Sequence, residues 1–287
     1  MCIAGSAAAR GRTFSLTKPV PAVPRVAFLG NSYFYFNDTP RLLQELHGGE
    51  HALFTADCLR GGSSWRSLLV DGDGMEARSE WNRFPWNGKP TVEALLRDPY
   101  DFVVCVDYSQ NNARGDHKAE TTAALDKIVS MAKAGGSKTI VLMPSAAYLA
   151  PAKGSEAIGS WADFYYKQGA GYREHLRYLL AAGVDAKIAD ANEAYKVVKE
   201  EDPALWQLLF HTDNFHPTVF GTFLQACIIH ATIFGQAPAE SALPPDPKVL
   251  WARARRLLPR NKDPAQWPTR DQLLYLREVA ARVAAMQ

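Results

Sequence analysis

The chain has 287 residues, of which 47% are hydrophobic and 22% charged, and this composition is typical of a globular protein with one large domain or two small ones. Its 32 basic and 30 acidic side chains leave a formal net charge of +2, so the charge balance indicates neither a nucleic-acid partner nor a membrane surface. There is no run of about 18 apolar residues, which argues against a membrane-spanning helix.

Residues 1–23 are rich in Ala, Gly and Pro and are predicted to form an N-terminal tail. Residues 1–22 lack the apolar middle of a secretory signal, so the expected location is cytoplasmic, or exported if a signal has been removed. The cysteines show no Cys-x-x-Cys spacing and most lie in apolar patterns, so neither a metal site nor a disulfide framework is expected. They are Cys2, Cys58, Cys105 and Cys227.

Short apolar runs that end in turns or polar clusters predict the strands of a sheet. They cover residues 25–29, 52–58, 102–106, 139–144 and 186–190. Helical spacing occurs between them and after the last one, at residues 38–46, 91–97, 118–134, 172–182, 192–201, 218–234, 247–258 and 270–286. Strands that alternate with helices of this length predict right-handed βαβ units, hence a mostly parallel sheet sandwiched by helices.

Two long segments, residues 72–88 and 150–171, lack regular patterns and are predicted to be loops. Both are rich in aromatic residues, including Trp81 and Trp86 in the first and Trp161 in the second. Because functional residues often lie on loops that a rigid scaffold positions, we expect these two segments to line a pocket.

The first predicted strand stops at Gly30, and Ser32 follows it directly. Asp38 and Pro40 then mark the start of a helix with leucines at helical spacing. A strand, a tight turn and a helix in this order place the turn at the edge of the sheet where open α/β folds bind ligands. Ser32 is therefore a candidate nucleophile.

The segment before the helix at residues 218–234 contains Asp213 and, three residues later, His216. A carboxylate beside an imidazole can fix the tautomer that leaves the other ring nitrogen free as a base. Each motif alone is more typical of a turn or a helix cap. Polar or glycine turns also follow the second and third strands, and such turns converge on one edge of a parallel sheet. Together they predict Ser32 as nucleophile, His216 as general base and Asp213 as orienting acid.

In this order the motifs, which lie between about residues 25 and 235, resemble the conserved blocks of the SGNH, or GDSL-type, hydrolases. Gly30-Asn31-Ser32 is similar to the first block, Gly61-Gly62 to the second, Ser109-Gln110-Asn111 to the third and Asp213-x-x-His216 to the last. The resemblance implies a three-layer α/β/α sandwich with a flavodoxin-like sheet of about five strands. We expect this hydrolase domain at residues 24–236, and residues 237–287 as a helical extension packed on it.

Enzymes of that family hydrolyse esters through a serine acyl-enzyme, which implies an acyl- or acetyl-esterase with Ser32, His216 and Asp213 in the roles above. The expected substrate is a small-molecule or glycan ester, with no cofactor and no metal. The family's usual Asp before the serine is Asn31 in this chain, a change expected to be tolerated. The acyl group, the alcohol and the oligomeric state stay open.

The resemblance also implies an oxyanion hole made by the backbone amides of Ser32 and Gly62 and a side-chain amide of the third block. That block is usually Gly-x-Asn-Asp, and counting from Asp101 puts Gln110 at the position of the asparagine. Gln110 is therefore the expected donor, with Asn111 as its substitute. Pocket-lining residues are expected at Gly61, Tyr108, Asn31 and Trp161.

Two other uses of these residues remain open. A non-catalytic protein could bind a carbohydrate or acyl group in the same cleft, because aromatic residues that stack on sugars are frequent. They are Trp65, Trp81, Trp86, Trp161, Tyr165 and Tyr166. His211, Asp213 and His216 could instead ligate a metal, which would leave Ser32 and Gln110 without a role. The motifs of α/β-hydrolases, dinucleotide-binding folds and P-loops are absent from the places where those folds need them.

Overall fold

The computed structural model describes residues 23–75, 91–150, 158–254 and 266–287, and the fold and site below concern these residues. At its centre is a five-stranded sheet in which all neighbouring strands are parallel, in the order β2-β1-β3-β4-β5. The strands are β1 (Arg25–Gly30), β2 (Phe54–Leu59), β3 (Phe102–Cys105), β4 (Thr139–Leu142) and β5 (Ala186–Ile188). The parallel sheet predicted from the sequence is therefore confirmed.

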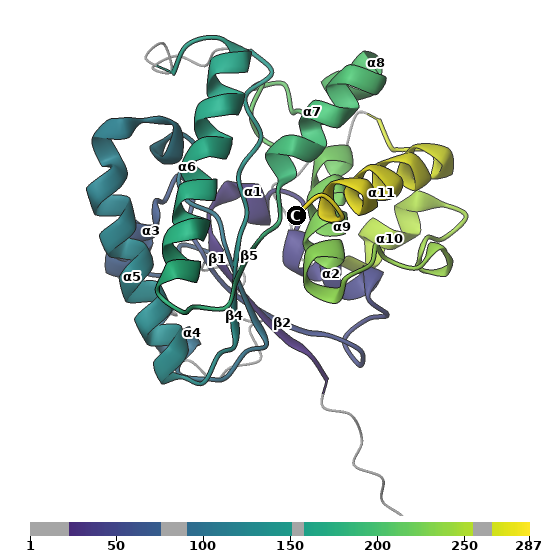
Figure 1. Cartoon of the computed structure of the whole chain (residues 1–287). Helices are drawn as coiled ribbons and strands as arrows, with labels where there is room; N and C mark the ends of the chain where they lie inside the picture. Colours follow the sequence, from purple (N-terminus) through teal and green to yellow (C-terminus); the bar gives the residue numbers. More distant parts are fainter. Residues whose placement is uncertain (1–22, 76–90, 151–157, 255–265) are drawn as a thin grey trace, which may run out of the picture.

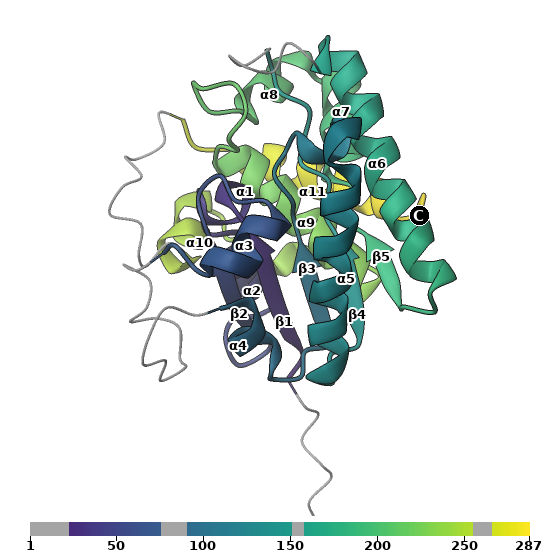
Figure 2. The same cartoon turned by 90° about the vertical axis from the view of Figure 1, so that its left-hand side faces the viewer.

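Helices cover both faces of the sheet, so the fold has the three layers that we expected (Figures 1 and 2). One layer contains α3 (Trp65–Asp71), α4 (Val92–Leu96), α5 (Lys118–Ala134) and α6 (Trp161–Ala181). The other contains α2 (Thr39–Leu46), α7 (Ala191–Glu201), α8 (Pro203–Leu208), α9 (Val219–Phe234), α10 (Pro247–Ala254) and α11 (Arg270–Ala284). The short helix α1 (Ser32–Tyr35) follows β1, and 3₁₀ turns occupy η2 (Asn111–Ala113), η3 (Gly115–His117) and η5 (Glu240–Ala242).

The two helical layers bury different residues of the same strands, because successive side chains of a strand point to opposite faces. Phe28 and Val104 belong to the core under α2, α7, α9 and α11. Leu29 and Cys105, the next residues along β1 and β3, belong to the core under α3, α4, α5 and α6. Strands buried on both faces need apolar residues at every position, which explains the continuous apolar runs in the sequence.

The predicted loop at residues 150–171 is wrong in its second half, because α6 already begins at Trp161 with a capping box. Two glycines of this stretch, Gly169 and Gly171, lie inside the helix. A Cβ at Gly171 would come within 2.2 Å of the Asn112 carbonyl oxygen. Glycine is needed there because it lets α6 approach the turn that follows β3.

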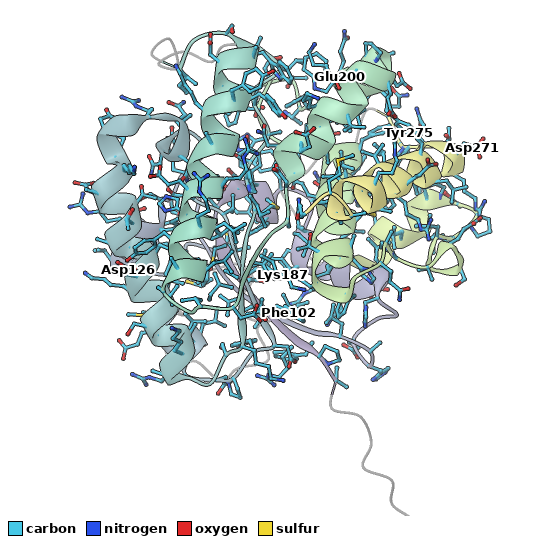
Figure 3. All side chains as sticks on the ribbon, in the orientation of Figure 1. Phe102, Asp126, Lys187, Glu200, Asp271 and Tyr275 are labelled. Atoms are coloured by element: carbon cyan, nitrogen blue, oxygen red, sulfur yellow. The ribbon has the colours of Figure 1, made fainter. Side chains whose placement is uncertain are left out.

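Residues that follow α9 pack against the core that contains α9, because α11 contributes Leu276 and Val279 to this core (Figure 1). Charged side chains such as Asp126 on α5 and Glu200 on α7 lie on the outer surfaces of the helices (Figure 3). Among the described residues, no helix is long and apolar enough to cross a membrane.

Several predicted features lie outside the described residues. They are almost all of the N-terminal tail, most of the loop at residues 72–88 with Trp81 and Trp86, and the end of the helix at residues 247–258. The short helices α1, α3 and α8, in contrast, are described but are not indicated by the sequence pattern.

Candidate active site

Ser32 lies at the carboxyl end of β1, as the first residue of α1 (Figure 1). Asn31 caps this helix, because its side-chain oxygen accepts a hydrogen bond from the Tyr33 amide at 3.2 Å. Ser32 is buried to 8% exposure. Its backbone amide belongs to the first turn of the helix, where amides have no partner within the helix.

The Asn31 side chain joins the three turns that follow β1, β2 and β3. Its Nδ2 donates to the Ser63 carbonyl and to the Asp107 carbonyl, both at 3.0 Å. Asn31 is only 2% exposed, and its oxygen is already used by the helix cap. Asn31 was expected to line the pocket, and the structure places its amide between the turns, where it holds them together.

We expect Asn31→Asp to lower the free energy of unfolding by roughly 2–4 kcal/mol at pH 7. An ionised carboxylate only accepts hydrogen bonds, and here it would face two carbonyl oxygens. Urea unfolding followed by circular dichroism measures the change. Wild-type stability in this variant would contradict the bridging role of Asn31.

His216 and Asp213 face each other in the loop before α9. The Asp213 Oδ2 to His216 Nδ1 distance is 2.7 Å, and Asp213 Oδ1 accepts from the backbone amides of Phe215 at 3.1 Å and His216 at 3.0 Å. The loop is closed by the His211 amide, which donates to the His216 carbonyl at 2.7 Å. The carboxylate requires a proton on Nδ1, which leaves Nε2 as the basic nitrogen.

The electrostatics of this pair keep the carboxylate charged and the imidazole neutral. Burial acts to raise the pKa of Asp213, but hydrogen bonds from His216 and Phe215 outweigh it and the pKa lies below its ordinary value. Burial lowers the pKa of His216 in spite of the neighbouring carboxylate. A neutral imidazole at pH 7 is the form that can accept a proton.

α1 lies directly against the His216 loop. The ring of Phe36, four residues after Ser32, stacks on the His216 ring with a centroid distance of 3.8 Å. Asn37 Nδ2 donates to the Pro217 carbonyl at 2.9 Å. Within the described parts of the chain, Ser32 Oγ makes no hydrogen bond. Catalytic hydrogen bonds are often long in a free enzyme and shorten when substrate binds.

The turn after β3 separates its two amide candidates. Gln110 is buried, and its Nε2 lies 3.4 Å from the hydroxyl of Tyr148, which also lies 2.5 Å from Ser109 Oγ. Asn111 Nδ2 donates instead to the Asp107 carboxylate at 3.2 Å. The Asn111 amide is thus occupied within the protein, while the Gln110 amide has a single contact at the upper limit of hydrogen-bond length.

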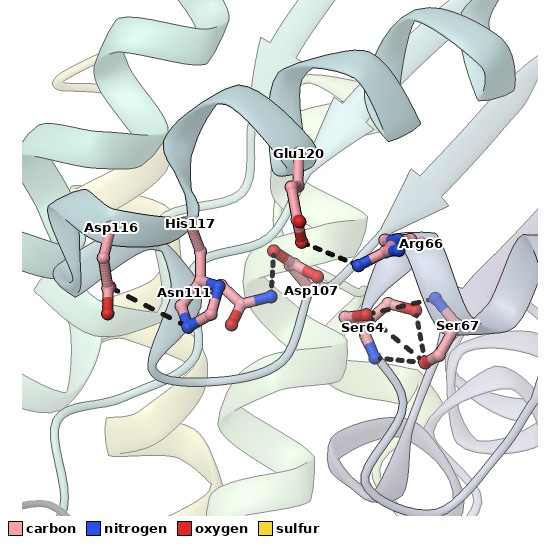
Figure 4. Close-up of polar contacts among 8 residues, drawn as sticks. All are labelled: Ser64, Arg66, Ser67, Asp107, Asn111, Asp116, His117 and Glu120. Carbon is pink, nitrogen blue, oxygen red and sulfur yellow. Dashed lines mark hydrogen bonds and ion pairs between the residues drawn. The ribbon is translucent and has the colours of Figure 1, made fainter.

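Gly62 lies in the turn after β2 with φ of +66°, a conformation that glycine adopts without strain. A groove of about 490 Å³ is lined by Gly62 and by Tyr108, which is 36% exposed. Its walls come from α3 and α5, where Arg66 pairs with Glu120 at 2.9 Å (Figure 4). The adjoining Gly61 packs on Tyr35, whose hydroxyl would be 2.9 Å from a Cβ at that position.

Solved structures share this arrangement of strands and helices. A protein of Slackia heliotrinireducens described as an SGNH hydrolase is 22% identical, with a TM-score of 0.54 over 74% of this chain and 99% of that one. The fold of this chain is that of the SGNH hydrolases. A DUF4886 family protein of Bacteroides uniformis is 14% identical, with a TM-score of 0.55 over 81% and 93% of the two chains. No model of a known protein family and no curated protein matches the sequence.

In this SGNH fold, Tyr148 is a site residue that sequence reasoning missed. It lies in the loop after β4, contacts Ser109 and Gln110, and packs against Phe215 at a ring distance of 5.3 Å. The Leu149 amide donates to the Asn214 carbonyl at 2.8 Å, so the same loop also holds the His216 segment. No local motif marks Tyr148, because only tertiary contacts bring it to the site.

Trp161, which was expected to line the pocket, packs against the aromatic cluster that contains Tyr148 and Tyr165. Its ring stacks on Tyr165 with a centroid distance of 5.5 Å, and Lys199 Nζ lies 4.7 Å from the ring centroid. It also meets Trp206 edge to face. These contacts belong to the packing of α6 against α7 and α8, which accounts for this tryptophan without a ligand.

The alternative of a metal bound by His211, Asp213 and His216 has no support. Within the described ranges no cluster of three such side chains has the arrangement of a metal site. His211 Nδ1 is 3.8 Å from Asp213 Oδ2 and more than half of its side chain is exposed.

Proposed function

We propose that this protein is a serine esterase in which Ser32 attacks the substrate, His216 is the general base and Asp213 orients it. The observation that carries the proposal is the Asp213–His216 pair, with a 2.7 Å contact, on a loop that packs against the helix beginning at Ser32. A half-buried carboxylate, an imidazole held by it and a serine at the edge of a parallel sheet form the arrangement that acyl transfer requires.

The reaction proceeds in two steps. His216 Nε2 takes the proton of Ser32 Oγ as this oxygen bonds to the ester carbonyl carbon, and the protonated imidazole then gives the proton to the departing alkoxide. A water molecule, deprotonated by His216 Nε2, then bonds to the acyl carbon of the acyl-enzyme. The protonated imidazole returns this proton to Ser32 Oγ as the bond between Oγ and the acyl carbon breaks, which releases the carboxylic acid and the free serine.

The negative charge on the carbonyl oxygen is held by the backbone amides of Ser32 and Gly62 and by the Gln110 side chain. Gln110 is preferred to Asn111 because the Asn111 amide already donates to Asp107. Gln110 also lies on the Tyr148 side of the turn, and Tyr148 in turn packs against Phe215 beside His216.

The groove beside Gly62 supports an ester with a polar alcohol portion, such as a sugar or another small hydroxylated molecule. The groove is lined by the basic side chain of Arg66 and by the acidic side chains of Asp71 and Glu120. It therefore offers hydrogen-bond donors and acceptors without net attraction for an anion. A volume of about 490 Å³ is within the usual range for a small-ligand site. The exposed Tyr108 ring offers a surface on which a sugar can stack.

Reaction with a fluorophosphonate probe tests the proposal directly, because this probe modifies only an activated serine. We expect one label per chain, located on Ser32 by mass spectrometry. Turnover of p-nitrophenyl esters from acetate to octanoate then sizes the acyl pocket, and an acetylated monosaccharide tests the polar alcohol. A protein that neither labels nor turns over any of these esters would instead be a non-catalytic binding protein on the same fold.

Asp213→Asn is expected to reduce kcat with little change in KM. The amide no longer stabilises the protonated imidazole and favours the wrong tautomer, a change that can cost up to about 10⁴-fold in other serine hydrolases. Steady-state kinetics on p-nitrophenyl acetate measure the loss. Unchanged turnover would show that the backbone amides and Phe36 orient His216 without the acid.

The pH dependence of kcat/KM should have its acidic limb below pH 6.5, the ordinary pKa of histidine. Activity requires neutral His216, and burial lowers the pKa of this histidine, so the active form persists to more acidic pH before protonation removes it. Initial rates between pH 4 and 8 with a non-ionisable ester locate the limb. A limb above pH 7 would contradict this assignment of the base.

A further inference from the structure

Asp107, the second residue after β3, is a fully buried carboxylate that contacts two loops at once. Its Oδ1 accepts from the Trp65 backbone amide at 2.8 Å, at the end of the loop that contains Gly62. Its Oδ2 accepts a hydrogen bond from Asn111 Nδ2 at 3.2 Å (Figure 4). A second one comes from Asn112 Nδ2 at 3.4 Å, and both asparagines follow Gln110 in the same turn. Further hydrogen bonds come from the Tyr108 amide and the Thr121 side chain.

The main chain of Asp107 is anchored as firmly as its side chain. Its carbonyl accepts from Asn31 Nδ2 at 3.0 Å, and its amide donates to the Tyr172 hydroxyl on α6 at 3.0 Å. Asn31 precedes Ser32 and also binds the Ser63 carbonyl. The three turns that carry the proposed oxyanion donors are therefore joined to one another through Asp107 and Asn31.

We propose that Asp107 is a positioning residue of the oxyanion hole, whose carboxylate sets the spacing between the Gly62 loop and the Gln110 turn. This inference rests on the proposed esterase function. Donors stabilise an oxyanion only when they are preorganised around it, and a displacement of about 1 Å can cost about 100-fold in rate. Asp107 does not touch the substrate and acts through the loops that it holds.

The presence of a charge at this position supports a role beyond packing. Burial raises the pKa of Asp107 to about 6 although several donors act in the opposite direction, so the charged form is disfavoured by its surroundings. An asparagine would still accept from the Trp65 amide without placing a charge in the core. A carboxylate accepts hydrogen bonds from both loops at the same time. A neutral amide oxygen accepts such hydrogen bonds less strongly.

The test compares wild type, Asp107→Asn and the matched control Asp190→Asn on p-nitrophenyl acetate. Asp190 is likewise buried after a strand, with a pKa raised by burial, but it caps α7 and contacts neither donor loop. For Asp107→Asn we expect kcat to fall about 10- to 100-fold, with KM and the melting temperature retained. Inhibition by phenylboronic acid, which forms a tetrahedral serine adduct, should weaken by a similar factor. Asp190→Asn should keep wild-type kinetics.

The outcomes separate this inference from the proposed function. A wild-type enzyme that is active and labels on Ser32, with full kcat in Asp107→Asn, overturns the positioning role and leaves the esterase intact. The positioning role is also overturned if kcat falls only in those variants whose melting temperature falls as well. If the wild type neither labels nor hydrolyses the ester, the proposed function fails, and the inference fails with it.

Asn112→Ala keeps the inference testable if Asp107→Asn does not fold. Among the described residues, the Asn112 Oδ1 atom has no hydrogen-bond partner, so the truncation removes chiefly the contact to Asp107. We expect kcat to fall by about threefold to tenfold with KM unchanged, because the turn loses one of its two side-chain amides on the carboxylate. A wild-type kcat in this variant overturns the inference.

Discussion

Ser32→Ala is expected to abolish hydrolysis of p-nitrophenyl acetate, with kcat reduced by a factor on the order of 10⁴ to 10⁶. Without the hydroxyl no acyl-enzyme forms, and the remaining oxyanion donors can only assist direct attack by water. His216→Ala should cost a similar factor, because the serine is a poor nucleophile without a base. The double variant should be no worse than either single variant, since the two residues act as a unit.

Matched controls make this result specific. Ser130→Ala and His51→Ala change an exposed serine on α5 and an exposed histidine in the turn before β2, and both should retain full turnover. Circular dichroism must show that all five variants, the double variant included, remain folded. An active Ser32→Ala protein would mean that another group performs the chemistry, and the assignment of the nucleophile would have to be abandoned.

Gln110→Ala should reduce kcat by about 10²–10³-fold with a small change in KM, the effect of losing one donor of an oxyanion hole. The donor acts when negative charge develops on the carbonyl oxygen, so its removal raises the barrier more than it weakens substrate binding. Asn111→Ala should lose no more than about tenfold, because its amide is directed at Asp107 rather than at substrate.

Steady-state kinetics of the two alanine variants, together with Gln110→Glu, decide between these amides. The glutamate variant keeps the length of the side chain but replaces the donor by an acceptor, so it should be at least as inactive as Gln110→Ala. The reverse order of losses, severe for Asn111 and mild for Gln110, would transfer the donor role to Asn111 and require the Asp107 contact to break during the reaction.

Much of the fold is determined locally and is therefore visible in the sequence. The strands are apolar runs because the parallel sheet is covered on both faces, and α5 occupies the residues predicted for it because its apolar spacing and terminal glycines are short-range signals. Ser32 and the Asp213–His216 pair are predicted from signals of the same kind. Each is a short motif whose position relative to a strand or a helix follows from nearby residues.

The tertiary structure alone decides how the amides and the buried carboxylate are used. Counting along the chain leaves Gln110 and Asn111 as alternatives, and only the Asp107 contact shows that the Asn111 amide is occupied. The sequence predicts Asn31 as a pocket residue, whereas in the structure its amide lies between two carbonyl groups from distant turns. Side-chain hydrogen bonds between loops far apart in sequence leave no periodic pattern, so they cannot be predicted from spacing.

The start of α6 follows the same principle. Residues 150–171 show no regular apolar pattern, so the sequence predicts a loop up to residue 171. The helix begins at Trp161 with a capping box between Ser160 and Asp163, and its packing against the turn after β3 leaves no space for a side chain at Gly171, next to the Asn112 carbonyl. By itself the sequence determined the parallel sheet and the residues at the ends of its strands. Long-range packing decided which of their polar groups face one another and which remain available for chemistry.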